Sequence, residues 1–331
     1  MLKYAIVGVG TLGHTHLYSS TQVMKDACTE VKLVALCDIR EEIITDADKE
    51  GKAKGCRIYT NVDDLLANEE LDFVVTALPT YLHAEIGIKI MKKGIHLFSE
   101  KPMAINYEEA AEMVKVAKEM NVKLMIGQCT RFEPRNQKLK EIIDSKIYGR
   151  VIQAYFTRTA SLPPMGWEGW FRDGAKSGGA ALDLHVHDVD LINYLFGMPK
   201  AVASLATSYL TEHDFIRSLY YYEEDIAVNS LCEWGRTVSF PGEGPTFFVR
   251  FEKGIVNYAK GKMTYHPEDS KEPEPIEFAA DDSYALEVLD FIDCIVNNKK
   301  STINDCESTL ESTRLALAEK KSANIKDIVK L

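Results

Sequence analysis

The chain has 331 residues, 46% of them hydrophobic and 27% charged, which is typical of a globular protein with room for two domains. No run reaches the roughly 18–20 apolar residues that span a bilayer, and the opening MLKYAIVGVG reads as a strand, so we expect no membrane contact and no signal peptide. The net charge of −11 argues against general nucleic-acid binding, since phosphate contacts need a basic face.

The cysteines are scattered along the chain. Their number, 7, is odd, and no C-x-x-C pair or zinc-knuckle spacing occurs. A disulfide framework is therefore not expected, and the pattern favours a reducing, cytoplasmic setting.

A glycine motif follows the first strand-like run. Residues 3–9, KYAIVGV, are mainly apolar, and G-x-G-x-x-G runs from Gly8 to Gly13 before the helix-compatible residues 14–25. Glycines let the backbone turn tightly and approach a pyrophosphate, while a helix N-terminus supplies N–H donors. The motif predicts a dinucleotide site that includes Gly8, Gly10, Thr11, Leu12 and Gly13.

An acid ends the second strand-like run, residues 31–38. Asp38 lies somewhat farther beyond Gly13 than the usual interval of about 20 residues, and the intervening loop can absorb the excess. A carboxylate here accepts hydrogen bonds from ribose hydroxyls and repels a 2′-phosphate. NAD is therefore favoured over NADP, although the nearby Arg40 blurs that preference and leaves NADP possible.

Apolar runs then alternate with helix-like segments. The runs are 71–78, 95–99 and 123–127, and the helix-like segments between them are 81–94 and 106–120. This alternation predicts a parallel, doubly wound sheet whose carboxyl ends face the cofactor. The residues that follow those ends are candidates for cofactor or substrate contacts: Leu78, Pro79, His83, Glu100, Lys101, Gln128 and Arg131.

The pattern changes near residue 150. Aromatic and β-branched runs follow one another with short turns, which predicts a large antiparallel sheet. The predicted strands are 151–160, 201–210, 220–235, 236–240, 246–261 and 263–267, and the predicted helices are 177–197, 283–298 and 308–323. We expect a dinucleotide-binding domain at 1–124 and a second α+β domain at 125–331.

Several segments together resemble one family. The glycine motif with His16, LPTYLHAE (78–85), GIHLFSEKP (94–102), GQCTRFEP (127–134) and SGGAALDLHVHDVD (177–190) are similar, in order, to the glucose–fructose oxidoreductase/inositol dehydrogenase (Gfo/Idh/MocA) family. The resemblance implies a Rossmann domain and a second domain with a large open sheet. It also implies NAD(P)-dependent oxidation or reduction of a secondary hydroxyl or carbonyl on sugars, polyols or their derivatives. Family members commonly form dimers or tetramers through the exposed sheet face.

The stretch ALDLHVHDVD (181–190) raises the question of a metal site. In a helix, Asp183 and His187 lie about 40° apart on one face, whereas His185 points elsewhere. A strand would place both histidines on one face and favour a metal. The glycine–proline exit after residue 196 favours a helix, so we expect no metal. Many family members carry a small residue where this chain has His185.

Asp183 and His187 suit alcohol oxidation. A histidine titrates near neutral pH and accepts the hydroxyl proton, and an aspartate orients the imidazole. Lys101 could stabilise the developing alkoxide, and whether it or His187 carries the proton stays open. Glu100 either bonds ribose or fixes Lys101. The less favoured alternative is that Lys101 is a solvated loop lysine and that His187 is a structural helix histidine bonded to Asp183.

The sequence therefore predicts an NAD(P)-dependent oxidoreductase of a sugar- or polyol-like substrate. The substrate contacts are predicted to be Lys101, Arg131, Trp167, Asp183 and His187, with Trp167 forming an apolar wall or belonging to the core. Two alternatives remain: a redox-assisted glycosidase or lyase that regenerates its NAD, and a non-catalytic dinucleotide-sensing regulator.

Overall fold

The chain forms two compact units. A computed structural model describes residues 1–47, 51, 53–164, 166–237 and 239–331. The first unit comprises Met1–Phe132 and Asp281–Leu310, and the second comprises Glu133–Ala280 and Glu311–Leu331. This division differs from the predicted domain boundary after residue 124, because the strand that begins at Leu124 completes the first sheet and residues 281–310 return to the first unit.

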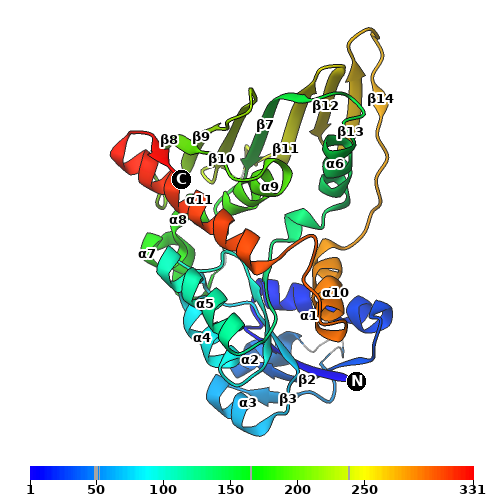
Figure 1. Ribbon diagram of the computed structural model, residues 1–331. Coiled ribbons are helices and arrows are strands. Elements are labelled where there is room, and N and C mark those ends of the chain that lie inside the picture. The colour runs from blue at the N-terminus through cyan, green and yellow to red at the C-terminus, as the bar shows by residue number, and fades with distance from the viewer. Residues whose placement is uncertain (48–50, 52, 165, 238) are drawn as a thin grey trace. The chain divides into compact units, whose positions relative to one another are not determined.

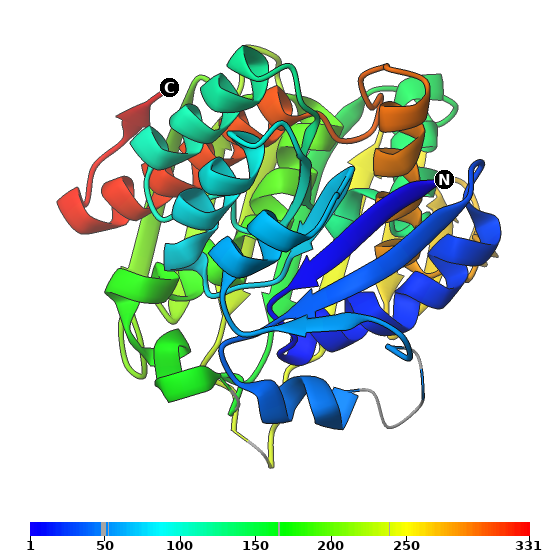
Figure 2. The ribbon, with the colours of Figure 1, turned by 90° about the horizontal axis from the view of Figure 1, so that it is seen from below.

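The first unit contains a parallel sheet of 6 strands in the order β3-β2-β1-β4-β5-β6 (Figures 1 and 2). The strands are β1 (Leu2–Val7), β2 (Val31–Cys37), β3 (Arg57–Tyr59), β4 (Phe73–Thr76), β5 (His96–Glu100) and β6 (Leu124–Gly127). The doubly wound Rossmann prediction is thus confirmed. Only β3 was not predicted, because three largely exposed residues carry no apolar run.

Helices cover both faces of this sheet. They are α1 (Thr11–Asp26), α2 (Glu41–Ala47), α3 (Val62–Asn68), α4 (His83–Met91), α5 (Tyr107–Glu119) and α10 (Ser283–Val296). Alternate residues of β1 enter different cores: Tyr4 and Ile6 pack with residues of α1 and α10, whereas Ala5 and Val7 pack with residues of α4 and α5. The helix predicted at 283–298 therefore exists, but it belongs to the first unit and not to the second domain.

The second unit contains a sheet of 9 strands in the order β14-β13-β12-β11-β7-β10-β9-β8-β15 (Figure 1). Its strands are β7 (Val151–Thr159), β8 (Ala201–Thr207), β9 (Phe215–Tyr221), β10 (Ala227–Glu233), β11 (Gly244–Phe251), β12 (Gly254–Ala259), β13 (Lys262–Pro267), β14 (Glu274–Pro275) and β15 (Val329–Lys330). The pair β7–β10 is parallel and its neighbours pair antiparallel, so the prediction of a large, mainly antiparallel sheet is confirmed.

Two strand predictions in this unit are wrong. Residues 236–240 form no strand among the described positions; Thr237 and Phe240 make an isolated bridge instead. The run predicted from residue 220 is two strands, since β9 begins earlier, at Phe215, and a turn precedes β10. In both places aromatic and β-branched residues favoured a strand prediction, and the turn residues beside them were not recognised.

Helices of the second unit pack on one face of its sheet, and among the described residues of this unit no helix covers the other face (Figure 1). The helices are α6 (Pro134–Ser145), α7 (Gly174–Ser177), α8 (Gly179–Asp183), α9 (Val186–Phe196) and, from Glu311 on, α11 (Cys306–Ile325). Along β9, Ile216, Ser218 and Tyr220 are buried, whereas Arg217 and Leu219 are exposed. No helix in the described ranges is long and apolar enough to cross a membrane.

The helix predicted at 177–197 is interrupted twice. Gly178 and Gly179 adopt φ values of +76° and +70°, which separate α7 from α8. A Cβ at Gly179 would lie 2.0 Å from the carbonyl oxygen of Glu212, so only glycine fits there. The N–H of His185 then bonds the carbonyl of Ala180 at 2.8 Å, which closes α8 with a wide turn before α9 begins.

Candidate functional site

The three motif glycines serve different purposes. Gly8 has a φ of +85°, and a Cβ there would lie 2.4 Å from the carbonyl oxygen of Ala77. A Cβ at Gly13 would lie 2.0 Å from the carbonyl oxygen of Gly8, so Gly13 permits close packing of helix on strand. A Cβ at Gly10 would meet nothing within 4 Å, which leaves room for a ligand to approach the backbone.

The amino end of α1 lies beside this open space. Gly10 is the N-cap, no side chain caps it, and the first turn, which begins at Thr11 and Leu12, contains no acidic residue. The first N–H groups of the helix are thus available to an anion, and the helix dipole favours one. The loop fits the pyrophosphate of a dinucleotide.

Asp38 lies directly after β2, as predicted, and is 7% exposed. Its Oδ2 accepts a hydrogen bond from the N–H of Val9 at 2.9 Å. Its Oδ1 accepts hydrogen bonds from the backbone N–H of Arg40 at 3.1 Å and from Arg40 Nε at 3.2 Å. The carboxylate therefore fixes the glycine loop and holds the Arg40 side chain beside it.

His83 joins two loops at the carboxyl edge of the first sheet. Its Nδ1 is 2.6 Å from the carbonyl oxygen of Pro102, and its Nε2 is 2.7 Å from that of Leu78, which precedes Pro79. Burial lowers the pKa of His83 below its usual value. Both ring nitrogens thus face backbone carbonyls, and the predicted contact of His83 with the cofactor stays a prediction.

Glu100, the last residue of β5, holds the backbone of Lys101. Glu100 Oε2 accepts a hydrogen bond from the N–H of Lys101 at 3.2 Å, and Oε1 is 2.6 Å from Nε2 of His16 on α1. Glu100 is only 2% exposed, whereas Lys101 is half-buried. This geometry favours the interpretation in which Glu100 fixes Lys101.

Gln128 and Arg131 follow β6. Gln128 is fully buried, and within the described residues neither its Nε2 nor its Oε1 has a hydrogen-bond partner. An unpaired buried polar group costs about 1–3 kcal/mol, so this amide is suited to a bound polar group. Arg131 donates through Nη1 to the carbonyl oxygen of Ile303 at 3.0 Å and through Nη2 to Ser308 Oγ at 3.1 Å.

Asp183 and His187 lie on either side of the turn between α8 and α9. Asp183, the last residue of α8, is 7% exposed, and His187 is half-buried in the first turn of α9. The N–H of His187 bonds the carbonyl of Leu184 at 3.4 Å. Because α8 and α9 are separate helices, the 40° relation expected of one continuous helix no longer follows from the spacing, and the pairing of Asp183 with His187 stays a prediction.

His185 points into the interior of the second unit. Its Nε2 lies 3.1 Å from Ser230 Oγ and 3.3 Å from Glu319 Oε2. Burial alone would lower the pKa of His185, but Glu319 and Asp188 hold it well above the usual value. His185 therefore belongs to a buried charged network.

Arg158 and Asp188 form a buried ion pair in the same network. Arg158 donates to Asp188 through Nε at 2.8 Å and through Nη2 at 3.0 Å. Burial disfavours the charge of Asp188, but Arg158 brings the pKa of this carboxyl below its usual value. Sequence reasoning missed this pair, because the partners are far apart in the chain.

Trp167 begins a short 3₁₀ segment, Trp167–Arg172, and is half-buried. Two other aromatic residues of the segment, Trp170 and Phe171, stack at 4.0 Å, and Phe171 contacts the buried Trp234 edge-on at 5.9 Å. These two rings cover the core of the second unit. The role of Trp167 as a substrate wall stays a prediction.

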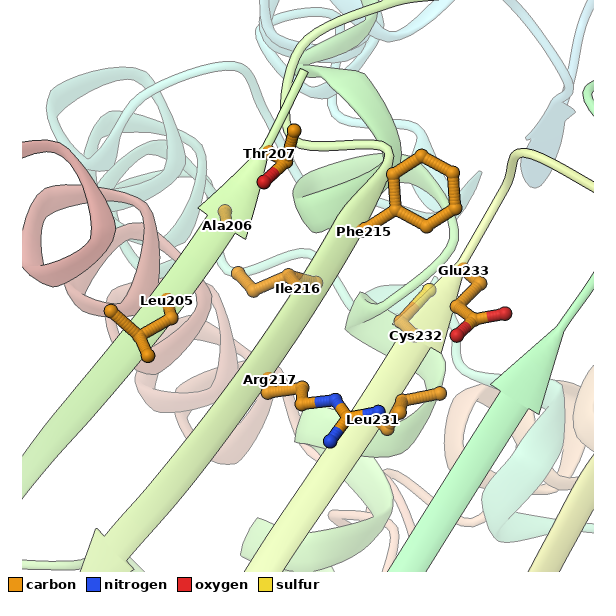
Figure 3. A pocket seen from close by; sticks show the side chains of 9 residues that line it. All are labelled: Leu205, Ala206, Thr207, Phe215, Ile216, Arg217, Leu231, Cys232 and Glu233. Atoms are coloured by element: carbon orange, nitrogen blue, oxygen red, sulfur yellow. The ribbon is translucent and has the colours of Figure 1, made fainter. Parts of the chain in front are cut away.

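A hollow of about 340 Å³ lies on the second sheet over β8, β9 and β10 (Figure 3). Arg217 and Leu231 are paired neighbours on its floor, and Leu205 and Phe215 also line it. None of the predicted catalytic residues lines this hollow, so it belongs to the sheet surface and not to the candidate site.

Comparison with known proteins supports a dinucleotide-binding first unit and a second unit of the same family. The family model described as "Oxidoreductase family, NAD-binding Rossmann fold" matches residues 2–128, and the model described as "GFO/IDH/MocA C-terminal domain" matches residues 136–257. Together they cover most of the chain.

Curated relatives include several enzymes. A 2,7-anhydro-N-acetylneuraminate hydratase of Mediterraneibacter gnavus is 31% identical over 208 residues, which is 60% of this chain and 50% of the relative. The scyllo-inositol 2-dehydrogenase (NAD(+)) of Bacillus subtilis is 25% identical over 328 residues, which is 93% of this chain and 90% of the relative. An uncharacterized oxidoreductase of Streptococcus pneumoniae is 30% identical over 71% of this chain and 63% of its own length. The chain thus spans about half to two thirds of some curated relatives that it matches.

Solved structures share the fold along the whole chain. The WlbA dehydrogenase from Bordetella pertussis, in complex with NADH and UDP-GlcNAcA, has a TM-score of 0.84 at 23% identity and covers 100% of this chain and 98% of its own. A levoglucosan dehydrogenase in complex with NADH and levoglucosan has a TM-score of 0.87 at 17% identity, with 99% of each chain covered. The chain belongs to the GFO/IDH/MocA oxidoreductase family, and its first unit is an NAD-binding Rossmann domain.

Proposed function

We propose that this protein is an NAD(P)-dependent oxidoreductase that transfers a hydride between a nicotinamide cofactor and a secondary hydroxyl or carbonyl of a sugar, polyol or related compound. The observation that carries the proposal is the glycine loop, where open space at Gly10 adjoins the uncapped N-terminus of α1. The buried, unpaired amide of Gln128 supports it. When bound, the nicotinamide ring accepts or donates the hydride. The dehydrogenases among the relatives suggest the substrate class.

Lys101, Asp183 and His187 are the proposed proton-handling residues. Lys101 donates a hydrogen bond to the reacting oxygen and stabilises its developing negative charge. His187 accepts the hydroxyl proton, and Asp183 orients the imidazole. Arg131 and Trp167 are proposed substrate contacts.

NAD is the proposed cofactor, with NADP as the weaker ligand. The Asp38 carboxylate repels the extra phosphate of NADP. Arg40, which could attract that phosphate, is held against Asp38 through its Nε. The remaining proposed cofactor contacts are Leu78, Pro79 and His83 at the carboxyl edge of the sheet.

A substrate panel tests the proposal. Inositols, aldoses and sugar acids, each incubated with NAD and separately with NADP, are expected to give net formation of reduced cofactor for at least one substrate, and faster with NAD. The rate is followed by absorbance of the reduced nicotinamide. Absence of nicotinamide binding in calorimetry at millimolar NAD and NADP would rule out the proposal.

A second candidate function follows from the relatives named hydratase. Adding water to a substrate involves no net oxidation. In that case the same residues would act on a transiently oxidised substrate, and bound NAD would be regenerated in each turnover. Product formation without accumulation of NADH in the same panel would favour this candidate.

The open sheet face is the proposed site of self-association. On β8 and β9, Leu205 is 71% exposed, Leu219 is 55% exposed and Tyr221 is 43% exposed, an apolar surface that a second copy of the chain would cover. We expect a homodimer or homotetramer, and the double substitution Leu205→Glu, Leu219→Glu should shift it to monomer in sedimentation velocity. A wild-type monomer at micromolar concentration would contradict this. The odd number of cysteines and the lack of a disulfide-like spacing pattern support a proposed cytoplasmic location.

A further inference from the structure

Three ionisable side chains meet inside the first unit. His16 of α1 is 3% exposed, Glu100 of β5 is 2% exposed, and Glu287 of α10 is fully buried. One ligand atom from each lies within 4.8 Å of the other two. The cluster therefore connects the helix of the glycine loop, the strand that leads to Lys101 and the returning helix α10.

The packing of the fold does not explain why the carboxyl group of Glu287 is buried. Within the described part of the chain, neither of its carboxyl oxygens has a hydrogen-bond partner. Two adjacent carboxylates in a buried place cannot both remain charged without a bound cation or proton. Burial, together with the charges of Glu100 and Asp282, raises the pKa of Glu287 well above its usual value.

The other titratable groups around the cluster do not supply a compensating charge. Asp282 accepts a hydrogen bond from Ser19 at 2.7 Å, and the Tyr284 ring contacts the His16 ring edge-on at 5.9 Å. Cys129, Glu100 and burial raise the pKa of Tyr284, so its phenol stays uncharged.

The geometry favours a proton, and not a metal ion, as the positive charge that neutralises one of the two buried carboxylates. His16 Nε2 and Glu100 Oε1 are 2.6 Å apart, which is a hydrogen-bond distance. Two ligands of one tetrahedral zinc ion lie about 3.3 Å apart at ordinary bond lengths. The His16–Glu100 contact is thus a direct hydrogen bond, and a carboxyl oxygen of Glu287 lies within 4.8 Å of a ligand atom of each residue.

We propose that Glu287 is a positioning residue: as an uncharged carboxylic acid it acts with His16 to hold the Glu100 carboxylate, and through Glu100 it holds Lys101. Glu100 Oε2 already accepts the N–H of Lys101, so any shift of Glu100 moves the Lys101 backbone. The inference rests on the proposed function in assigning Lys101 to the reaction. It adds that α10 sets the position of Lys101 relative to the glycine-loop helix.

The first test needs no activity. The folded protein keeps a proton on Glu287 that the unfolded chain releases above about pH 4.3, so raising the pH should favour unfolding. In urea titrations between pH 5.5 and 8, the unfolding equilibrium constant of the wild type should rise up to about tenfold per pH unit relative to Glu287→Gln, which has no proton to lose. Equal pH slopes would overturn the inference. So would a metal ion that co-purifies with the wild type and is absent from Glu287→Gln.

The second test concerns turnover. Glu287→Leu replaces the carboxyl group by an apolar side chain, and its kcat should fall on the order of tenfold to a hundredfold with little change in the KM for NAD. Glu287→Gln retains a donor and should recover most of the kcat. Asp290→Asn, one turn farther along α10, is the matched control and should leave kcat unchanged. Loss of kcat in Glu287→Gln equal to that in Glu287→Leu would contradict the proposal.

The two tests separate the possible failures. If the protein turns over no sugar or polyol, the proposed function fails, while the pH slope still reports the proton on Glu287. If Lys101 proves essential and Glu287→Leu has normal kcat, the positioning inference fails and the proposed function stands.

Discussion

Replacement of Lys101 by methionine is expected to reduce kcat by a factor of about 10² to 10⁴, with little change in the dissociation constant of NAD. Methionine keeps the length of the side chain but cannot donate a hydrogen bond to the reacting oxygen. The contact that holds this residue in place uses the Lys101 backbone N–H and the Glu100 carboxylate, so the substitution leaves it intact. Steady-state kinetics and NAD titration calorimetry measure the two quantities.

The matched control is Lys93→Met, an exposed lysine that precedes β5 in the same segment. It should behave as wild type. A Lys101→Met variant with normal kcat would remove Lys101 from the mechanism, and a Lys101→Met variant that no longer binds NAD would assign it to the cofactor instead. His187→Asn, compared with the wild type over a range of pH, then tells which of the two groups carries the proton: a pH profile of kcat equal to that of the wild type would exclude His187.

The cofactor half of the site could be predicted because its determinants are local in sequence. The spacing of Gly8, Gly10 and Gly13 after a strand, and of Asp38 at the end of the next strand, reflects backbone geometry that one βαβ unit imposes by itself. Strand–helix alternation likewise specified the parallel sheet. The structure adds what each motif glycine does: of the three, Gly10 alone leaves open space where a side chain would be.

The region around His187 was harder to predict for a physical reason. The periodicity of residues 177–197 is that of a helix, and α8 and α9 are both helical. The break between α7 and α8 comes from the left-handed conformations of Gly178 and Gly179. The break between Asp183 and His187 is the wide turn in which the N–H of His185 bonds the carbonyl of Ala180. Contacts of this kind leave no periodic signal, so the angle between Asp183 and His187 could not be derived from spacing.

The sequence around Glu287 contains a signal for a buried carboxyl group that the sequence analysis did not use. In the segment SYALEVLDFIDCIV, Phe291 and Cys294 follow Glu287 at helical spacing and are buried, so the glutamate falls on the apolar face. A lone carboxyl at such a position predicts a buried polar partner. Its identity, Glu100 with His16, depends on the tertiary fold and could not be read from the sequence.

Replacement of Arg158 by methionine is expected to lower the free energy of unfolding by about 3–5 kcal/mol, because it leaves the Asp188 carboxylate buried without its partner. The pair is bidentate, with the side chains 12% and 3% exposed. Urea denaturation at pH 7 measures the loss. The loss should shrink at low pH, because burial disfavours the charge of Asp188 but Arg158 holds its pKa below the usual value, and the wild type loses that stabilisation once Asp188 is protonated.

The double substitution Arg158→Met, Asp188→Leu removes both charges and should regain most of the lost stability, since well-packed apolar residues often replace a buried ion pair at little cost. Arg150→Met is the control: Arg150 pairs with Glu252 at the surface, where both side chains are about half exposed, and its loss should change stability little. An Arg158→Met variant as stable as Arg150→Met would show that Asp188 finds another partner or meets water. In that case the Arg158–Asp188 pair would not hold α9 against β7, and it would not fix the position of His187 on α9.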